Sequence, residues 1–365
     1  MRFSIHVKVM FVLAVFLLML SGSACAGTVE RFSDVRWIGG QHLQFGNTLP
    51  EVTYRSEAIS TFWFNDRVKF DGSETLAASI LEAGKNPGLG VRSLHARGIT
   101  GKDVRVAIID MPNPRLHPEY RDKFEAYFVT KDFRPQDGDV SMNVYEMHGP
   151  AVVSLLVGKE SGTAPGAKLY YAATPMWTYG ILYLEQALRW IIEENNKLPA
   201  VDKIRVVSVS ANPDHPLWAE AVAEAKVAGI LVLDCRDNDE TGIILNGYYD
   251  LDDPDDISRF TPGSPKDGMN EIGRNISGSK IFAPAARRSQ AEEYDNTGGN
   301  RWQYTGDGGI SWSIPYAAGI LAMGWQVDPT LTNDEIITLL RDTAYLKDGY
   351  RIINPVKFIE AIENR

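Results

Sequence analysis

The sequence predicts an α/β fold: a doubly wound, mostly parallel sheet with helices on both faces, preceded by a small N-terminal accessory segment. Short runs of Val, Ile and Leu, such as 104–109 and 205–209, alternate with longer stretches of helical pattern. Such continuous apolar runs are typical of strands buried on both faces, and intervening helices allow neighbouring strands to run parallel. A composition of 44% hydrophobic and 23% charged residues is that of a soluble globular protein.

The overall charge argues against a nucleic-acid partner. The net charge is −10, and the 37 Lys and Arg residues form no long basic run that could follow a phosphate backbone. Nucleic acid is therefore not the expected partner, and we expect a monomer.

Residues 1–26 are typical of a signal peptide. Arg2 and Lys8 precede the apolar run 9–20, and Ala24-x-Ala26 suits signal-peptidase cleavage. A membrane anchor and lipidation at Cys25 are the alternatives, although the run is short for a bilayer span. We therefore expect a protein that is secreted or held in the cell envelope. Cleavage would leave a single cysteine, which excludes an intramolecular disulfide.

Residues 27–86 form the accessory segment, and 87–365 form the main domain. The segment is rich in aromatic residues, has a helical pattern over 73–83 and contains no candidate catalytic group. We predict that it is a pro-segment that is removed during maturation, and the alternative is a permanent part that packs on the main domain.

The main domain reads as alternating strands and helices. We expect strands at 104–109, 168–172, 205–209, 229–233 and 280–283. We expect helices from about 149, at 181–194, at 217–227, from 311 to about 325, and after a capping box at Thr332. The polar stretches 263–278 and 290–309 are expected to be surface loops.

Three polar residues stand at ends of these elements. Asp110 ends a buried strand, His148 begins an apolar helix, and Ser311 follows two glycines at the start of another. A hydroxyl at a helix start, beside unpaired N–H groups, can act both as a nucleophile and in an anion-stabilising pocket. Each residue also has an ordinary interpretation, namely a turn aspartate, a structural histidine and an N-cap serine.

The motifs around these residues resemble those of subtilisin-like serine proteases. Gly309-Ile310-Ser311 with Pro315, Ala318 and Gly319 is similar to the family's serine motif, and the order Asp, His, Ser is that of the family. The resemblance covers about 90–344. It implies that Ser311 is the nucleophile, that His148 is the general base and that Asp110 orients His148.

The same resemblance indicates further site residues. Asn238, after the strand at 229–233, is similar to the family's oxyanion-stabilising asparagine, although a turn asparagine is the alternative. Ser210, Ala211 and Asn212 are similar to the strand segment that binds the substrate peptide.

Some residues depart from the family pattern. Met111 and Pro112 follow Asp110 where the family has Ser or Thr and Gly, Asp237 replaces a glycine, and Trp312 follows Ser311. The resemblance implies an endopeptidase that acts on protein or peptide substrates and needs no cofactor. The departures leave a second hypothesis, a weakly active or non-catalytic protein of the same fold that binds partner proteins. We expect no metal in the chemistry. A structural calcium at the acidic run 250–256 is an expectation, with a solvated loop as its alternative.

Overall fold

The computed structural model describes residues 28–36, 47–130, 147–174, 180–272, 276, 278–293 and 301–365. The expected signal peptide and Cys25 lie outside the described residues. Within the described part of the chain, no helix has both the length and the apolar character needed to cross a membrane.

A five-stranded parallel sheet lies at the centre of the main domain. Its strand order is β5-β6-β4-β7-β8, with every neighbouring pair parallel. The strands are β5 (Phe124–Val129), β6 (Lys168–Ala173), β4 (Arg105–Asp110), β7 (Ile204–Val209) and β8 (Leu231–Asp234). The sequence prediction of a parallel sheet is thus confirmed. It missed β5, because this edge strand is only partly buried and lacks a continuous apolar run.

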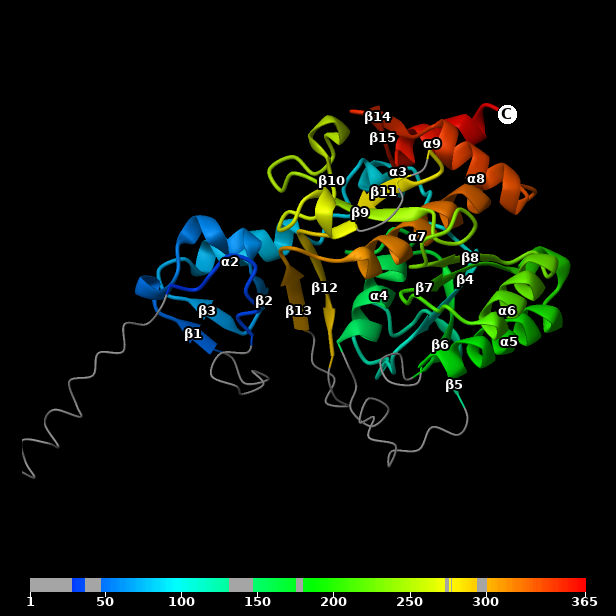
Figure 1. Ribbon diagram of the computed structural model, residues 1–365, viewed down its shortest axis with the longest axis horizontal. Coiled ribbons are helices and arrows are strands. Elements are labelled where there is room, and N and C mark those ends of the chain that lie inside the picture. The colour runs from blue at the N-terminus through cyan, green and yellow to red at the C-terminus, as the bar shows by residue number, and fades with distance from the viewer. Residues whose placement is uncertain are drawn as a thin grey trace, which may run out of the picture.

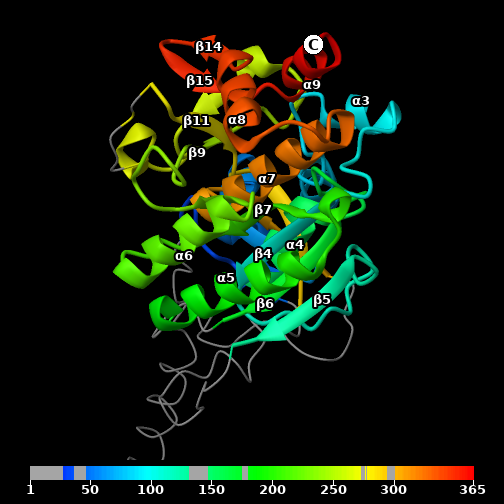
Figure 2. The same ribbon diagram turned by 90° about the vertical axis from the view of Figure 1, so that its right-hand side faces the viewer.

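Helices cover both faces of this sheet. The helices α5 (Gly180–Lys197) and α6 (Pro216–Val227) pack on one face, and α4 (His148–Val157) and α7 (Ile310–Val327) pack on the other (Figure 2). Alternate strand residues supply the two cores: Val106 of β4 packs toward α4 and α7, whereas Ala107 packs toward α5 and α6. Asp110 follows the same alternation and so falls on the face of α4.

A second, mixed sheet lies beside the first, with strand order β10-β9-β11-β15-β14. Its strands are β9 (Ile244–Tyr248), β10 (Thr261–Pro262), β11 (Ile281–Pro284), β14 (Tyr345–Lys347) and β15 (Tyr350–Ile352). The sequence placed the strand at 280–283 in the same sheet as β8. A compact loop follows β8 instead, in which the Asp234 N–H donates to the Thr241 carbonyl, and β9 starts a separate sheet.

Three helices complete the main domain: α3 (Val91–Ala96), α8 (Asn333–Asp342) and α9 (Pro355–Glu363). The expected capping box at the start of α8 is present, because Thr332 and Glu335 each bind the other's backbone N–H.

The N-terminal residues form a separate lobe, seen at the left of Figure 1. It contains β1 (Asn47–Leu49), β2 (Trp63–Asn65), β3 (Val68–Phe70) and the expected helix, α2 (Glu74–Ala83). Its small core is aromatic: Phe70 packs edge-on against Phe64 and Tyr54, with ring centroids 5.3 Å apart in each pair.

The lobe and the main domain share a three-stranded sheet, of order β12-β13-β2. Its strands β12 (Arg288–Glu292) and β13 (Arg301–Thr305) belong to the stretch that the sequence predicted as a surface loop. That prediction is wrong for both strands, since β12 is fully buried and β13 largely so. Their polar residues gave no strand signal because they are paired with polar groups of the lobe, far away in the sequence.

Candidate active site

Asp110 and His148 meet at the edge of the central sheet. Asp110 ends β4 and His148 is the first residue of α4, and Asp110 Oδ1 lies 2.7 Å from His148 Nδ1. The Met111 N–H donates to the same oxygen at 2.8 Å. The Asp110 carboxyl is fully buried, whereas the His148 side chain is 10% exposed. This arrangement fixes which imidazole nitrogen carries the proton, and it leaves the other nitrogen facing away from Asp110.

Ser311 is the second residue of α7. The helix begins at Ile310 and its N-cap is Gly309, so the expected N-cap at Ser311 is off by two residues. The Trp312 N–H of the first turn donates to the Gly309 carbonyl at 2.9 Å, whereas the N–H groups of Ile310 and Ser311 before it come too early in the helix for an acceptor within it. The backbone around Ser311 therefore offers hydrogen-bond donors beside the hydroxyl.

Pro315 lies inside α7 and leaves the backbone carbonyl of Ser311 without its usual helical partner. A proline has no N–H to donate to the carbonyl four residues earlier, and here that carbonyl belongs to Ser311. The Ser210 hydroxyl, just beyond β7, donates to the Ser311 carbonyl at 2.9 Å. The predicted substrate-segment residue Ser210 thus holds the start of α7.

The starts of α4 and α7 lie side by side. The rings of His148 and Trp312 are 5.0 Å apart between centroids, at 33° to one another. Since Trp312 adjoins Ser311, the structure brings Asp110, His148 and the backbone of Ser311 into one region, where the carboxyl end of β4 meets two helix starts.

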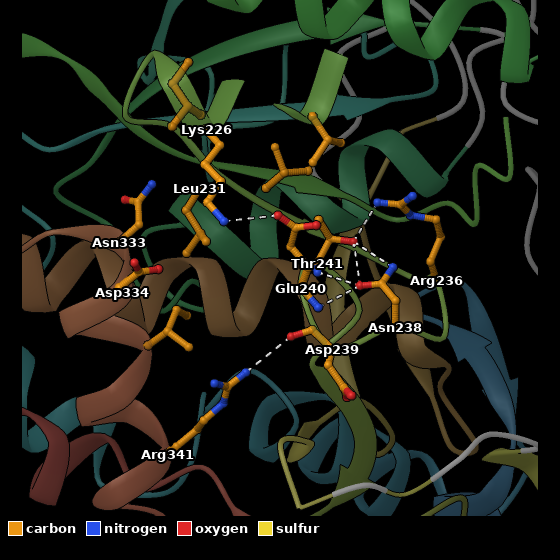
Figure 3. A pocket seen from close by; sticks show the side chains of 14 residues that line it. Lys226, Leu231, Arg236, Asn238, Asp239, Glu240, Thr241, Asn333, Asp334 and Arg341 are labelled. Carbon is orange, nitrogen blue, oxygen red and sulfur yellow. Dashed lines mark hydrogen bonds and ion pairs between the residues drawn. The ribbon is translucent and has the colours of Figure 1, made fainter. Parts of the chain in front are cut away.

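Asn238 lies differently from what the sequence led us to expect. Its side-chain oxygen accepts the N–H groups of Glu240 and Thr241, at 2.9 and 2.8 Å, and its side-chain nitrogen donates to the Thr241 hydroxyl at 3.1 Å. Figure 3 shows this amide turned into its own loop, in a cavity of about 680 Å³ that it shares with Lys226 and Arg341. Neither Asp110, His148 nor Ser311 lines this cavity.

The acidic residues near Asn238 are paired with cations. Asp234 is fully buried and binds Arg236 at 2.9 Å, and Glu240 lies 3.3 Å from Lys226. Their charges are therefore offset locally.

The other two residues of the expected substrate segment follow Ser210 directly. The Ala211 carbonyl accepts the Cys235 N–H at 2.8 Å, so this atom ties β7 to the loop after β8. Asn212 is exposed. Ala211 is half-buried and Ser210 is buried, so Asn212 is the most open of the three.

The carboxylates of the acidic run 250–256, where the sequence suggested a structural calcium, contact neighbouring groups of the chain. Asp250 forms an ion pair with Arg259, and Asp255 accepts the Gly90 N–H at 2.9 Å. Asp256 caps a short helical turn through Ser258. The carboxylates thus serve separate local contacts. Among the described residues, no group of three or more His, Cys, Asp or Glu side chains is arranged to hold a metal ion.

The sequence did not point to Tyr171, and it singled out Trp312 only as a departure from the family pattern, without its contact with His148. Tyr171, in β6, donates its hydroxyl to the Met111 carbonyl beside Asp110, and Trp312 packs on His148. An aromatic residue in an apolar strand or helix reads as core, so the pattern alone carries no sign of such a role.

Comparison with known proteins agrees with this geometry. The model of the Subtilase family matches residues 101–355, and the chain therefore belongs to this family of subtilisin-like serine proteases. Subtilisin NAT of Bacillus subtilis subsp. natto is 25% identical over 272 residues, and subtilisin E of Bacillus subtilis (strain 168) is 26% identical over 270. Each match covers 71% of this chain and spans 65% of the relative's length.

Solved structures show the same fold. Fervidolysin from Fervidobacterium pennivorans, described as a keratinolytic enzyme related to subtilisin, superposes with a TM-score of 0.54 at 16% identity. The superposition covers 74% of this chain and 44% of that protein. At this identity the likeness concerns the fold alone.

Proposed function

We propose that the protein is an exported serine endopeptidase that cleaves peptide bonds through an acyl-enzyme. The observation that carries the proposal is the 2.7 Å contact between Asp110 and His148, next to the start of the helix that holds Ser311. Membership of the subtilase family supports it.

The chemistry follows from these positions. The Ser311 hydroxyl attacks the scissile carbonyl, and His148 takes its proton and later returns it to the leaving amine. Asp110 holds the tautomer of His148 and stabilises the imidazolium that forms. The Ser311 N–H, at the start of α7, stabilises the oxyanion, and Asn238 is the second donor that we propose. No cofactor takes part.

We also propose where the protein acts, which substrates it takes and its oligomeric state. The signal-like residues 1–26 and the likeness to a relative named minor extracellular protease Epr, 24% identical over 301 residues, support export to the medium or the envelope. The acidic net charge supports protein or peptide substrates over nucleic acid, and we propose a monomer.

A second function is favoured by one observation. Because the Asn238 amide is bonded within its own loop, the site lacks this donor until the loop rearranges. A subtilase-fold protein that binds partner proteins and cleaves them weakly or not at all fits that arrangement.

A fluorophosphonate probe distinguishes the two functions. The purified protein without its signal segment should be labelled covalently at Ser311, because the probe needs an activated serine, and Ser311→Ala should not be labelled. Mass spectrometry of the labelled peptide locates the adduct, and subtilisin E serves as the positive control. An unlabelled protein beside a labelled control would favour the binding function.

A further inference from the structure

We propose that Tyr171 is a positioning residue for Asp110: its hydroxyl holds the turn after β4, so that the Asp110 carboxylate stays directed at His148. The inference rests on the proposed function for its kinetic consequence, but its structural basis is independent of activity. Tyr171 is fully buried and lies on β6, directly beside β4.

In the described part of the chain, the Asp110 carboxylate accepts one backbone N–H, that of Met111. The second residue of the turn that follows is Pro112, which has no N–H to donate to the Asp110 carboxylate. One carboxylate oxygen, Oδ1, accepts from Met111 and His148, as described above. The other, Oδ2, is buried, and no hydrogen bond reaches it from the described part of the chain. The direction of the carboxylate therefore depends on how firmly the turn itself is held.

The Tyr171 hydroxyl fixes the position of this turn. It donates to the Met111 carbonyl, one residue after Asp110. Burial and the nearby Asp110 charge raise the pKa of Tyr171 well above its ordinary value, so the phenol keeps its proton and remains a donor.

The hydroxyl also lies against the start of α4. A Cβ atom added at Gly149 would come within 2.7 Å of the Tyr171 oxygen and 2.5 Å of the Met111 carbonyl oxygen. Three groups are therefore closely packed here: the turn after Asp110, the phenol of Tyr171 and Gly149, the residue that follows His148. A shift of the turn would change the contact between Asp110 and His148.

A second tyrosine supports the first. The ring of Tyr127, on β5, stacks on Tyr171 with centroids 5.3 Å apart and planes 5° apart. Its hydroxyl accepts the Asn113 N–H at 3.0 Å, two residues beyond Met111. The neighbouring strands β6 and β5 thus hold two successive parts of the turn, at Met111 and at Asn113, through their tyrosine hydroxyls.

The test is Tyr171→Phe, with Tyr170→Phe as the matched control. The control removes the phenolic oxygen from the preceding residue of the same strand, Tyr170, which packs toward the opposite face of the sheet. We expect Tyr171→Phe to lower kcat about 10-fold with KM unchanged. The acid limb of the kcat/KM profile should move to lower pH, because a less well directed carboxylate stabilises the His148 imidazolium less. Tyr170→Phe should match the wild type in both.

A measurement without turnover separates this inference from the proposed function. In the Ser311→Ala background, NMR titration of the His148 ring gives its pKa, which Tyr171→Phe should lower and Tyr170→Phe should leave unchanged. If the wild type fails to hydrolyse peptides, this titration alone decides the role of Tyr171. An unchanged His148 pKa in folded Tyr171→Phe would overturn the inference. If that variant does not fold, Tyr127→Phe is titrated in its place, with the same expected direction.

Discussion

Single hydrogen bonds decide how each polar residue of this site is used. Pro315 has no N–H to donate to the Ser311 carbonyl, and the Ser210 hydroxyl donates to that carbonyl instead. Asn238, in contrast, satisfies its own loop, because a side-chain oxygen that accepts backbone N–H groups a few residues ahead closes a turn. The same residue type can thus serve catalysis or local structure, and only a donor-specific substitution distinguishes the two.

Asn238→Ala should lower kcat about 100- to 1,000-fold with KM close to that of the wild type, if its amide reaches the oxyanion during turnover. The matched control is Asn238→Asp, which keeps the oxygen that accepts the Glu240 and Thr241 N–H groups but removes the amide donor. Steady-state kinetics on a peptide substrate measure both. Full kcat in Asn238→Asp would show that the residue only closes its turn.

At the scale of elements, the strand that leads to the nucleophile is held from two sides. One side of β13 pairs antiparallel with β2 of the lobe. His117, in the loop after β4, donates from Nε2 to the carbonyl of Arg301, where β13 begins, and its Nδ1 accepts the Glu119 N–H. The contact with Glu119 needs the neutral imidazole, since a protonated Nδ1 could not accept, whereas Nε2 can donate to Arg301 in either form.

These contacts predict how stability depends on pH. Burial lowers the pKa of His117 from 6.5 to about 4, so the unfolded chain binds a proton in the range where the folded protein does not. The stability contributed by neutral His117 is therefore present above about pH 6.5 and is lost as the pH falls toward 4. The loss is about 3 kcal/mol from this residue.

The variant His117→Gln keeps an N–H donor for Arg301 and cannot titrate. Denaturant unfolding between pH 7 and 4 should show a shallower loss of unfolding free energy in the variant than in the wild type. His95, whose pKa burial also lowers, remains in both proteins and cancels in the comparison. Equal slopes in the two proteins would contradict the role given to His117.

At the scale of the whole molecule, the lobe is joined to the main domain through buried polar contacts. Arg36 lies 2.9 Å from Glu292 of β12 and 2.7 Å from the side-chain oxygen of Gln303 of β13. The Gly306 N–H donates to the Phe62 carbonyl of the lobe at 3.0 Å, five residues before Ser311. Removal of the lobe would expose these buried groups and release the segment that leads to the nucleophile.

These contacts lead us to propose, in place of the pro-segment predicted from the sequence, that residues 27–86 are a permanent part of the protein. Stripping one partner from a buried ion pair typically costs about 3 to 5 kcal/mol, and removal would also leave β13 with an open edge. Wild type and Ser311→Ala, both exported and weighed intact, should have equal masses apart from the single substitution. A wild-type form shorter by this segment, with the longer form only in Ser311→Ala, would show self-processing instead.

Several features of the molecule follow from the sequence alone. Short runs rich in Val and Ile at 104–109 and 205–209 predicted the parallel sheet, since such runs are typical of strands that are buried on both faces. The positions of Asp110 and His148 at element ends placed them at one edge of it, because the carboxyl ends of parallel strands and the helix starts that follow them share that edge. Ser311 is different, because α7 follows β13 of another sheet, and only the tertiary structure brings the start of α7 to this edge.

Other features exist only in the tertiary structure. The strands β12 and β13 look like polar loops in the sequence because their partners, such as Arg36 and Asn65, lie more than 200 residues away. The bonding of the Asn238 amide within its own loop and the contact of Tyr171 with Met111 likewise depend on side-chain directions. A one-dimensional pattern records burial and period, whereas these roles are set by which groups meet across elements.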